Sequence, residues 1–119
     1  MRDDLRIAVL GGLGFMGSHI CRELARRGHF VRIFDKLYAS HELIHDFAGA
    51  VQVVESDISR SHDVIESIFD VDIVINLIHT TVPGSSMKDP VYDITSNVAA
   101  AVGWLHQLSR TKVRKVLYV

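Results

Sequence analysis

The stretch Ile7-Ala8-Val9-Leu10-Gly11-Gly12-Leu13-Gly14-Phe15-Met16-Gly17 decides the fold. Residues 7–10 form an unbroken apolar run, which is typical of a parallel strand buried on both faces. The glycines that follow carry no Cβ atom, so another group can approach the backbone closely there. Residues 15–27 then show helical spacing of apolar residues, and Gly28 follows them. A strand, a glycine turn and a helix in this order predict a phosphate-binding turn at the helix N-terminus.

A carboxylate completes this pattern about 20 residues further on. The next apolar run, residues 30–34, ends at Asp35. A carboxylate at that place accepts hydrogen bonds from both hydroxyls of an adenosine ribose, and it repels the additional phosphate of NADP. Lys36 follows directly and weakens this preference. The sequence therefore predicts a dinucleotide site that prefers NAD to NADP.

The rest of the chain continues the alternation of strands and helices. We expect a short helix at 40–47, a strand at 51–54, a helix at 61–69, a strand at 72–77, a long loop at 78–90, a helix at 91–109 and a strand at 115–119. This order predicts an α/β fold with a doubly wound parallel sheet of the Rossmann type and the strand order 3-2-1-4-5. In the 61–69 helix, the residues expected on the inner side are Val64, Ile65, Ile68 and Phe69.

Composition restricts the class of protein. The 119 residues suffice for one domain, and 13 basic and 14 acidic residues leave a formal net charge of −1. With no block of like charges, neither nucleic acid nor an anionic membrane is an expected partner. No signal peptide or membrane span is recognisable, so we expect a cytoplasmic location. We predict a packing role for Cys21 and no metal site, because His41 and His45 lack a third ligand.

The motifs together resemble the N-terminal part of the extended short-chain dehydrogenases, and most closely the NAD-dependent nucleotide-sugar epimerases and dehydratases of the UDP-glucose 4-epimerase type. The family's turn usually reads Gly-Gly-x-Gly-Phe-Ile-Gly, and this chain differs only in having Met16 for Ile. At the end of the fourth strand the family usually has His-Leu-Ala-Ala. This chain has Asn76-Leu77-Ile78-His79 there, followed by Asp89-Pro90 and Asn97.

The resemblance implies that NAD is the cofactor and implies which residues bind it. The pyrophosphate would face the glycine turn, the adenosine ribose would face Asp35, and the adenine would face Asp57. The rest of the cofactor would face the end of the fourth strand. The implied set is Gly11, Gly14, Phe15, Met16, Gly17, Asp35, Lys36, Asp57, Ile58, Leu77, Ile78, His79 and Asn97. Two alternatives stay open: Asp57 caps the turn after its strand, and His79 is an ordinary loop residue. Ser85 or Ser86 would be the family's loop serine near the sugar nucleotide.

The same family carries its catalytic Tyr-x-x-x-Lys pair after the fifth strand, so we assign no catalytic residue here. We expect residues 1–119 to be the incomplete NAD-binding domain of a longer enzyme, truncated before the later strands and the substrate domain. That enzyme would epimerise or dehydrate a nucleotide sugar by transient hydride transfer. Alternatives are a non-catalytic NAD(P)-binding redox sensor of the same fold and a simple carbonyl reductase. The family also implies a homodimer, which exposure of Trp104 or Leu108 would indicate.

Overall fold

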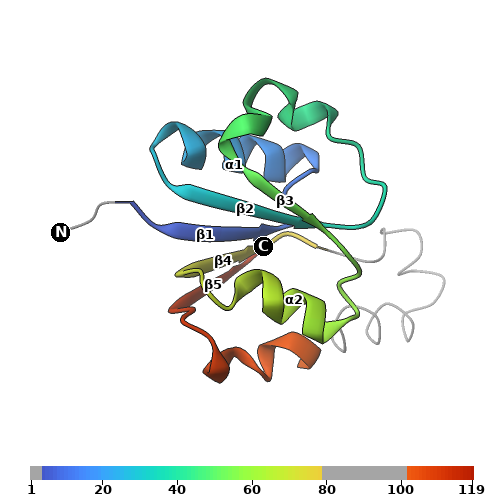
Figure 1. Cartoon of the computed structure of the whole chain (residues 1–119), viewed down its shortest axis with the longest axis vertical. Helices are drawn as coiled ribbons and strands as arrows, with labels where there is room; N and C mark the ends of the chain where they lie inside the picture. The colour runs from blue at the N-terminus through green and yellow to red at the C-terminus, as the bar shows by residue number, and fades with distance from the viewer. Residues whose placement is uncertain (1–3, 79–101) are drawn as a thin grey trace.

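The parallel sheet predicted from the sequence is present in the computed structural model of the chain, which describes residues 4–78 and 102–119. The sheet has five strands in the order β3-β2-β1-β4-β5, all parallel, and this confirms the predicted order 3-2-1-4-5 (Figure 1). The strands are β1 (Arg6–Leu10), β2 (Phe30–Asp35), β3 (Gln52–Glu55), β4 (Ile73–Asn76) and β5 (Lys115–Tyr118).

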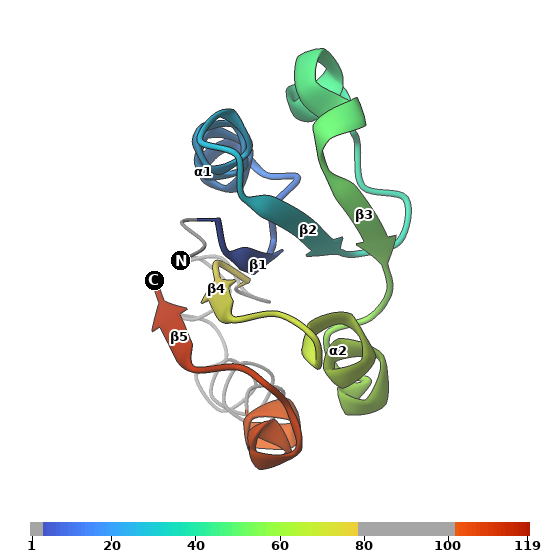
Figure 2. The same ribbon diagram turned by 60° about the vertical axis from the view of Figure 1, so that its left-hand side comes forward.

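Helical segments cover both faces of the sheet. The helix α1 (Phe15–Arg26) and the 3-10 helix η1 (Glu42–Ala50) lie on one face, and α2 (Ser61–Ile68) and the segment ending in η2 (Leu108–Arg110) lie on the other (Figures 1 and 2). In place of the helix expected at 40–47, the structure has the 3-10 helix η1, which begins and ends later in the chain. The backbone of Phe47 is non-helical and interrupts it. Of the helix expected at 91–109, residues 91–101 lie outside the described part of the chain, residues 102–105 are α-helical, and residues 108 and 109 belong to η2.

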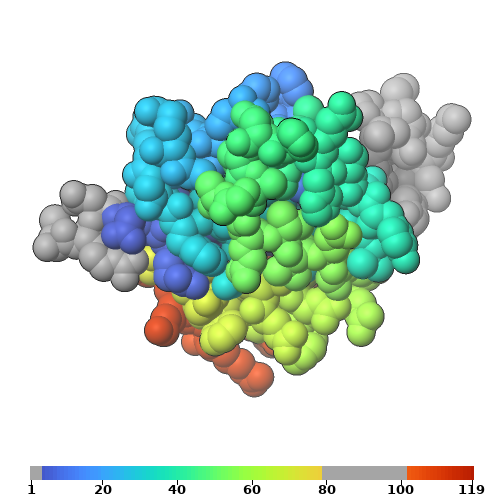
Figure 3. Space-filling view, turned by 45° about the horizontal axis from the view of Figure 1, so that its top comes forward, coloured from blue at the N-terminus to red at the C-terminus, as the bar shows by residue number. Residues whose placement is uncertain are grey.

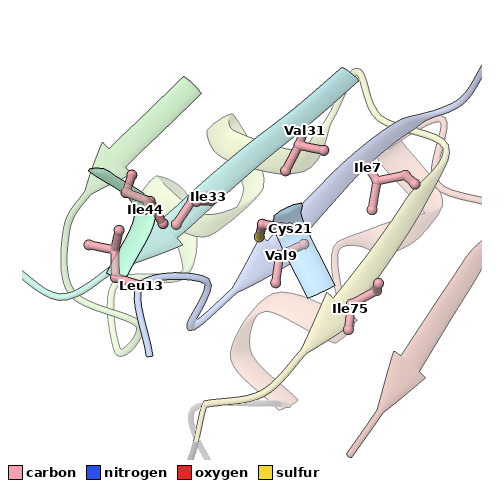
Figure 4. Packing of buried hydrophobic residues seen from close by; sticks show 8 residues of the cluster. All are labelled: Ile7, Val9, Leu13, Cys21, Val31, Ile33, Ile44 and Ile75. Carbon is pink, nitrogen blue, oxygen red and sulfur yellow. The ribbon is translucent and has the colours of Figure 1, made fainter. Parts of the chain in front are cut away.

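The strands β1 to β4 send alternate side chains into two separate cores, as a parallel sheet covered on both faces requires, whereas β5 contributes Val116 to one core only. In β1, Ile7 and Val9 join the core beneath α1 and η1, whereas Ala8 and Leu10 join the core beneath α2. The eight buried residues of the first core are Ile7, Val9, Leu13, Cys21, Val31, Ile33, Ile44 and Ile75 (Figure 4). The sheet is thereby fixed between two apolar layers.

Cys21 has the packing role that the sequence predicts. Its side chain is fully buried in the first core, and burial raises the pKa of the thiol to about 12. The thiol therefore stays protonated near neutral pH and behaves as a small apolar group. On the same face α1 and η1 lie side by side, joined by the ion pair between Arg22 and Asp46 at 2.9 Å (Figure 3).

The second core bears on two expectations from the sequence, the exposure of Trp104 and the burial of Phe69. Trp104 is fully buried there with Val64 and Ile68, so it has a core role and shows no exposure of the kind that would indicate a dimer. Phe69 was predicted on the inner side of the helix, but this is wrong, because its side chain is 54% exposed. The helix ends at Ile68, and the chain then turns so that Val71 occupies the buried position instead.

An ion-pair cluster lies near the start of the strands, and the sequence did not reveal it. Asp70 precedes β4, and its carboxylate contacts Arg32 at 2.6 Å and Arg6 at 3.0 Å. The side chain of Arg32 is only 12% exposed, and it also donates a hydrogen bond to the backbone oxygen of Ser67. Both guanidinium groups stand over the ring of Phe30. The cluster joins three parts of the chain that are distant in sequence: β1, β2 and the α2–β4 connection.

None of the helices in the described part of the chain combines the length and the apolar character that crossing a membrane requires.

We predict that Asp70→Asn lowers the free energy of unfolding at pH 7 by about 2 kcal/mol, since it leaves two partly buried arginines without their counter-charge. The arginines Arg32 and Arg6 hold the pKa of Asp70 below its usual value. The stabilisation is therefore complete above the unfolded-state pKa of about 4 and is lost as the pH falls through the folded-state pKa. Urea denaturation at pH 7 and at pH 3 measures both effects.

The matched control is Glu23→Gln, which removes a carboxylate that pairs with Arg26 and Arg27 on the exposed surface of α1. Exposed pairs contribute little to stability, so this variant should unfold almost as the wild type does at pH 7. Equal stability of Asp70→Asn and wild type at pH 7 would contradict the role assigned to the cluster.

Candidate functional site

A cleft of about 790 Å³ lies beyond the carboxyl ends of the strands. The strands β2 and β4 lie on opposite sides of β1 in the sheet. The connection from β1 therefore runs to one side, and the chain later returns to the other side to form β4, so the strand order reverses at this point. Parallel α/β sheets bind ligands at such a reversal, outside the carboxyl ends of the strands. The residues that line the cleft are Gly11, Leu13, Gly14, Phe34, Asp35, Lys36, Leu37, Ala39, Ser40, Ser56, Asp57, Ile58, Leu77 and Ile78.

The glycine turn joins β1 to α1 and forms one end of the cleft. Gly11 has a φ of +90°, a left-handed conformation that side chains rarely allow. Its N–H donates to the backbone oxygen of Phe34 at 2.7 Å, which ties the turn to β2. The N–H of Gly14 then donates to the oxygen of Gly11 at 3.3 Å and closes the turn.

Two of the other glycines are required by packing within the protein. A Cβ atom at Gly12 would lie 2.8 Å from the side chain of Ile33, and one at Gly17 would overlap the backbone of Gly11 and Gly12. The buried side chain of Ile33 and the backbone of Gly11 and Gly12 have no room to move away from such a Cβ atom. Gly17 thus lets α1 begin directly against the turn that follows β1, and Gly12 lets this turn pack against β2.

Gly14 differs from them. A Cβ atom at Gly14 would meet only the oxygen of Gly11, at the ordinary contact distance of 3.6 Å. The residue is exposed, lines the cleft and has a φ of −77°, which any residue adopts. Packing and backbone conformation therefore do not require glycine here. The space that its missing side chain leaves open is space in the cleft.

The N-terminus of α1 presents backbone donors beside this space. The first amide bonded into the helix is that of Ser18, which donates to Gly14. The N–H groups of Phe15, Met16 and Gly17 find no acceptor among the described residues, and the first turn contains no acidic side chain. Unpaired N–H groups and an uncompensated positive helix end attract anions. This end of the cleft is therefore suited to a phosphate group.

Asp35 ends β2, and its carboxylate lies against the glycine turn that leads into α1. One of its carboxylate oxygens accepts the N–H of Leu13 at 3.0 Å, and the other accepts the N–H of Lys36 at 2.8 Å. These bonds fix the orientation of the carboxylate. A carboxylate accepts about four hydrogen bonds, so acceptor capacity remains for hydroxyl groups in the cleft.

Asp57 and Ile58 form the wall of the cleft that follows β3. Asp57 accepts hydrogen bonds from the backbone N–H and the hydroxyl of Ser59, at 2.9 and 2.8 Å, and these bonds hold its pKa below the usual value. Asp57 therefore caps the turn, as one of the two sequence interpretations had it, and lines the cleft as well. Ile58 is half-buried against the core beneath α2.

Leu77 and Ile78 complete the cleft after β4. The buried side chain of Asn76 accepts the N–H of Ile78 at 3.1 Å and thereby fixes the direction of the chain. The side chain of Ile78 stands beside the turn: a Cβ atom at Gly11 would be 3.2 Å from its Cγ1 atom. The large side chain of Ile78 is thus a second reason, besides the positive φ, why position 11 has to be glycine.

The structure therefore brings together eight of the sequence-predicted residues: Gly11, Gly14, Asp35, Lys36, Asp57, Ile58, Leu77 and Ile78. Phe15, Met16 and Gly17 form the adjoining helix N-terminus. His79, Asn97, Ser85 and Ser86 lie outside the described residues. Sequence reasoning did not assign six further lining residues to the site: Leu13, Phe34, Leu37, Ala39, Ser40 and Ser56. Phe34 is a buried strand residue that reads as core, and the others are uncharged residues outside helices and strands, which carry no signal of their own.

Comparisons with known proteins agree with this geometry. The model of the NAD-dependent epimerase/dehydratase family matches residues 7–119. A UDP-glucose 4-epimerase from Lacticaseibacillus casei is 27% identical, over 96% of this chain and 34% of its own length. A UDP-glucuronic acid decarboxylase 1 from Arabidopsis thaliana is 33% identical, over 98% of this chain and 26% of its own length.

A solved structure shows the same likeness. The UDP-glucose 4-epimerase from Stenotrophomonas maltophila, determined with bound NAD and formylated UDP-arabinopyranose, has a TM-score of 0.78 and 28% identity, over 96% of this chain and 36% of its own. This chain thus spans about a third of the length of the relatives it matches. The family model covers nearly the whole chain, and the chain therefore belongs to the NAD-dependent epimerase/dehydratase family.

Proposed function

We propose that this chain is the dinucleotide-binding part of an NAD-dependent nucleotide-sugar epimerase or dehydratase. The observation that carries the proposal is Gly14, whose missing side chain neither packing nor backbone conformation requires. It adjoins three amides that have no acceptor in the part of the chain that the structure describes. A pyrophosphate needs both the space and the donors. The family adds NAD as the dinucleotide, and the relatives named for UDP-glucose and UDP-glucuronic acid add a UDP-sugar as the class of substrate.

In this proposal each wall of the cleft binds one part of the cofactor. The glycine turn and the N-terminus of α1 bind the pyrophosphate, Asp35 binds the adenosine ribose, and Asp57 and Ile58 flank the adenine. Leu77 and Ile78 continue the site beyond β4, and His79 and Asn97 are assigned to its further end. When bound, NAD supplies a reversible acceptor for hydride.

The residues that would carry out proton transfer on the sugar belong, in this proposal, to the part of the protein that the relatives have and this chain does not span. A positioned acid or base is needed for hydride transfer at a sugar hydroxyl. We assign none to the described residues. A cytoplasmic location and a homodimer remain predictions from the sequence.

The first prediction concerns the choice of cofactor. The chain should bind NAD at least tenfold more tightly than NADP, because the carboxylate of Asp35 would repel the 2′-phosphate at close range. Calorimetric titration with both dinucleotides measures the ratio. Lys36→Ala should increase the preference for NAD, since it removes a cation that lines the same cleft. Equal or tighter binding of NADP by the wild type would contradict the role of Asp35.

The second prediction concerns Gly14. Gly14→Val should weaken NAD binding by roughly a hundredfold or more, because the side chain occupies the place of the pyrophosphate. The circular dichroism spectrum should not change, since a Cβ atom there meets nothing closer than 3.6 Å.

The matched control for this experiment is Gly49→Val. A Cβ atom at Gly49 has no neighbour within 4 Å, and the residue lies in η1, outside the residues that line the cleft. This variant should bind NAD as the wild type does. Wild-type affinity in Gly14→Val would remove the basis of the proposed phosphate site.

The third prediction concerns turnover. This chain alone should convert no sugar nucleotide, whereas the longer protein that contains it should epimerise or dehydrate one. Incubation of both with NAD and a panel of UDP-, GDP- and dTDP-sugars, followed by chromatography, measures this. Turnover by the chain alone would show that a residue present here acts as the acid or base. No turnover by the longer protein, despite NAD binding, would favour the redox sensor.

A further inference from the structure

The loop of residues 36–41 forms one wall of the cleft without belonging to a helix or strand. It follows β2 (Figure 1). Its residues Lys36, Leu37, Ala39 and Ser40 all line the cleft. Within the loop, the N–H of Ala39 donates to the oxygen of Lys36 at 3.3 Å. Such a short segment needs other contacts to hold a single conformation.

Tyr38, in the middle of this loop, has an unfavourable backbone conformation. Its φ is +64°, and among the described residues it is the one non-glycine residue with a positive φ. This left-handed region is disfavoured for residues that carry a side chain. The side chain of Tyr38 is 96% exposed, so its burial cannot offset the cost. Another interaction must hold the backbone there.

Glu55 supplies that interaction. It is the last residue of β3 and the pairing partner of Asp35 in the sheet. Its Oε2 atom accepts the N–H of Tyr38 at 3.2 Å, and its Oε1 atom lies 2.5 Å from Nε2 of His41. These contacts hold the pKa of Glu55 below its usual value, so the carboxylate is ionised near neutral pH. One side chain thus fixes both the middle and the end of the loop.

We propose that Glu55 is a positioning residue for the cofactor: it holds the loop 36–41 in the conformation that completes the adenosine side of the cleft. The inference rests on the proposed function. Glu55 is not among the residues that line the cleft, so it would act through the loop and not by touching the dinucleotide. A wall that is already ordered before binding removes an entropic cost from association and raises affinity.

Glu55→Ala should weaken NAD binding roughly tenfold, measured by calorimetry on the whole chain. Glu55→Gln keeps the size and one acceptor oxygen, so its loss should be smaller. The matched control is Glu66→Ala, which removes another glutamate–histidine pair, with His62 at 3.1 Å on the surface of α2. That variant should bind NAD within twofold of the wild type.

A rescue experiment separates positioning from a general loss of structure. Asparagine tolerates the left-handed region better than tyrosine, so Tyr38→Asn lowers the cost that Glu55 offsets. We expect the double variant Glu55→Ala/Tyr38→Asn to recover a large part of the lost affinity. A merely structural role of Glu55 would lower thermal stability and show no such recovery.

The outcomes distinguish this inference from the proposed function. If the wild-type chain binds no NAD, both fail. If the wild type binds NAD and Glu55→Ala binds it within twofold, the positioning role alone is wrong. Loss of affinity in Glu55→Ala without recovery in the double variant also overturns the inference. If Glu55→Ala does not fold, the same comparison is made with Glu55→Gln, alone and combined with Tyr38→Asn.

Discussion

The close approach of helix α1 to the end of strand β1 is the constraint on which the site depends. It is possible because Gly17 has no side chain and lies against the backbone of the turn; Gly12, also without a side chain, lets the turn pack against Ile33 of β2. As a result, the first turn of α1 begins at the carboxyl ends of the strands, and its amides, which have no acceptor among the described residues, lie next to the cleft residue Gly14. Gly14 then keeps the space beside these amides open. Packing thus requires glycine at two positions of this turn, and the proposed phosphate site requires it at a third.

Charged side chains at the two ends of the parallel strands have different roles. Near the start of the strands, Asp70 joins Arg6 and Arg32 in a partly buried cluster that connects distant parts of the chain. At the carboxyl ends of the strands, backbone amides hold the carboxylates of Asp35 and Asp57 in place. These carboxylates can still accept hydrogen bonds from a ligand in the cleft. The ion pairs of Asp70, which connect distant parts of the chain, therefore lie away from the carboxyl ends of the strands, where the cleft is.

Strong periodicity made the fold predictable. The buried strand β1, the glycine turn and the position of Asp35 at the end of β2 can each be predicted from the neighbouring sequence. The strand order can be predicted from the right-handedness of the connections between parallel strands. What could not be predicted depends on contacts between distant residues. Nothing near Asp70 in the sequence points to Arg6, and nothing near Glu55 points to Tyr38 and His41. The exposure of Phe69 depends on where α2 ends, which apolar spacing does not fix within one residue.

The most direct measurement of the central claim is a titration of the isotopically labelled chain with NAD, followed through its backbone amide resonances. The account predicts that the largest shifts occur at Phe15, Met16 and Gly17, whose amides have no acceptor among the described residues, while amides near Arg6 and Asp70 do not shift. Shifts that leave the start of α1 unchanged and concentrate elsewhere on the surface would contradict it.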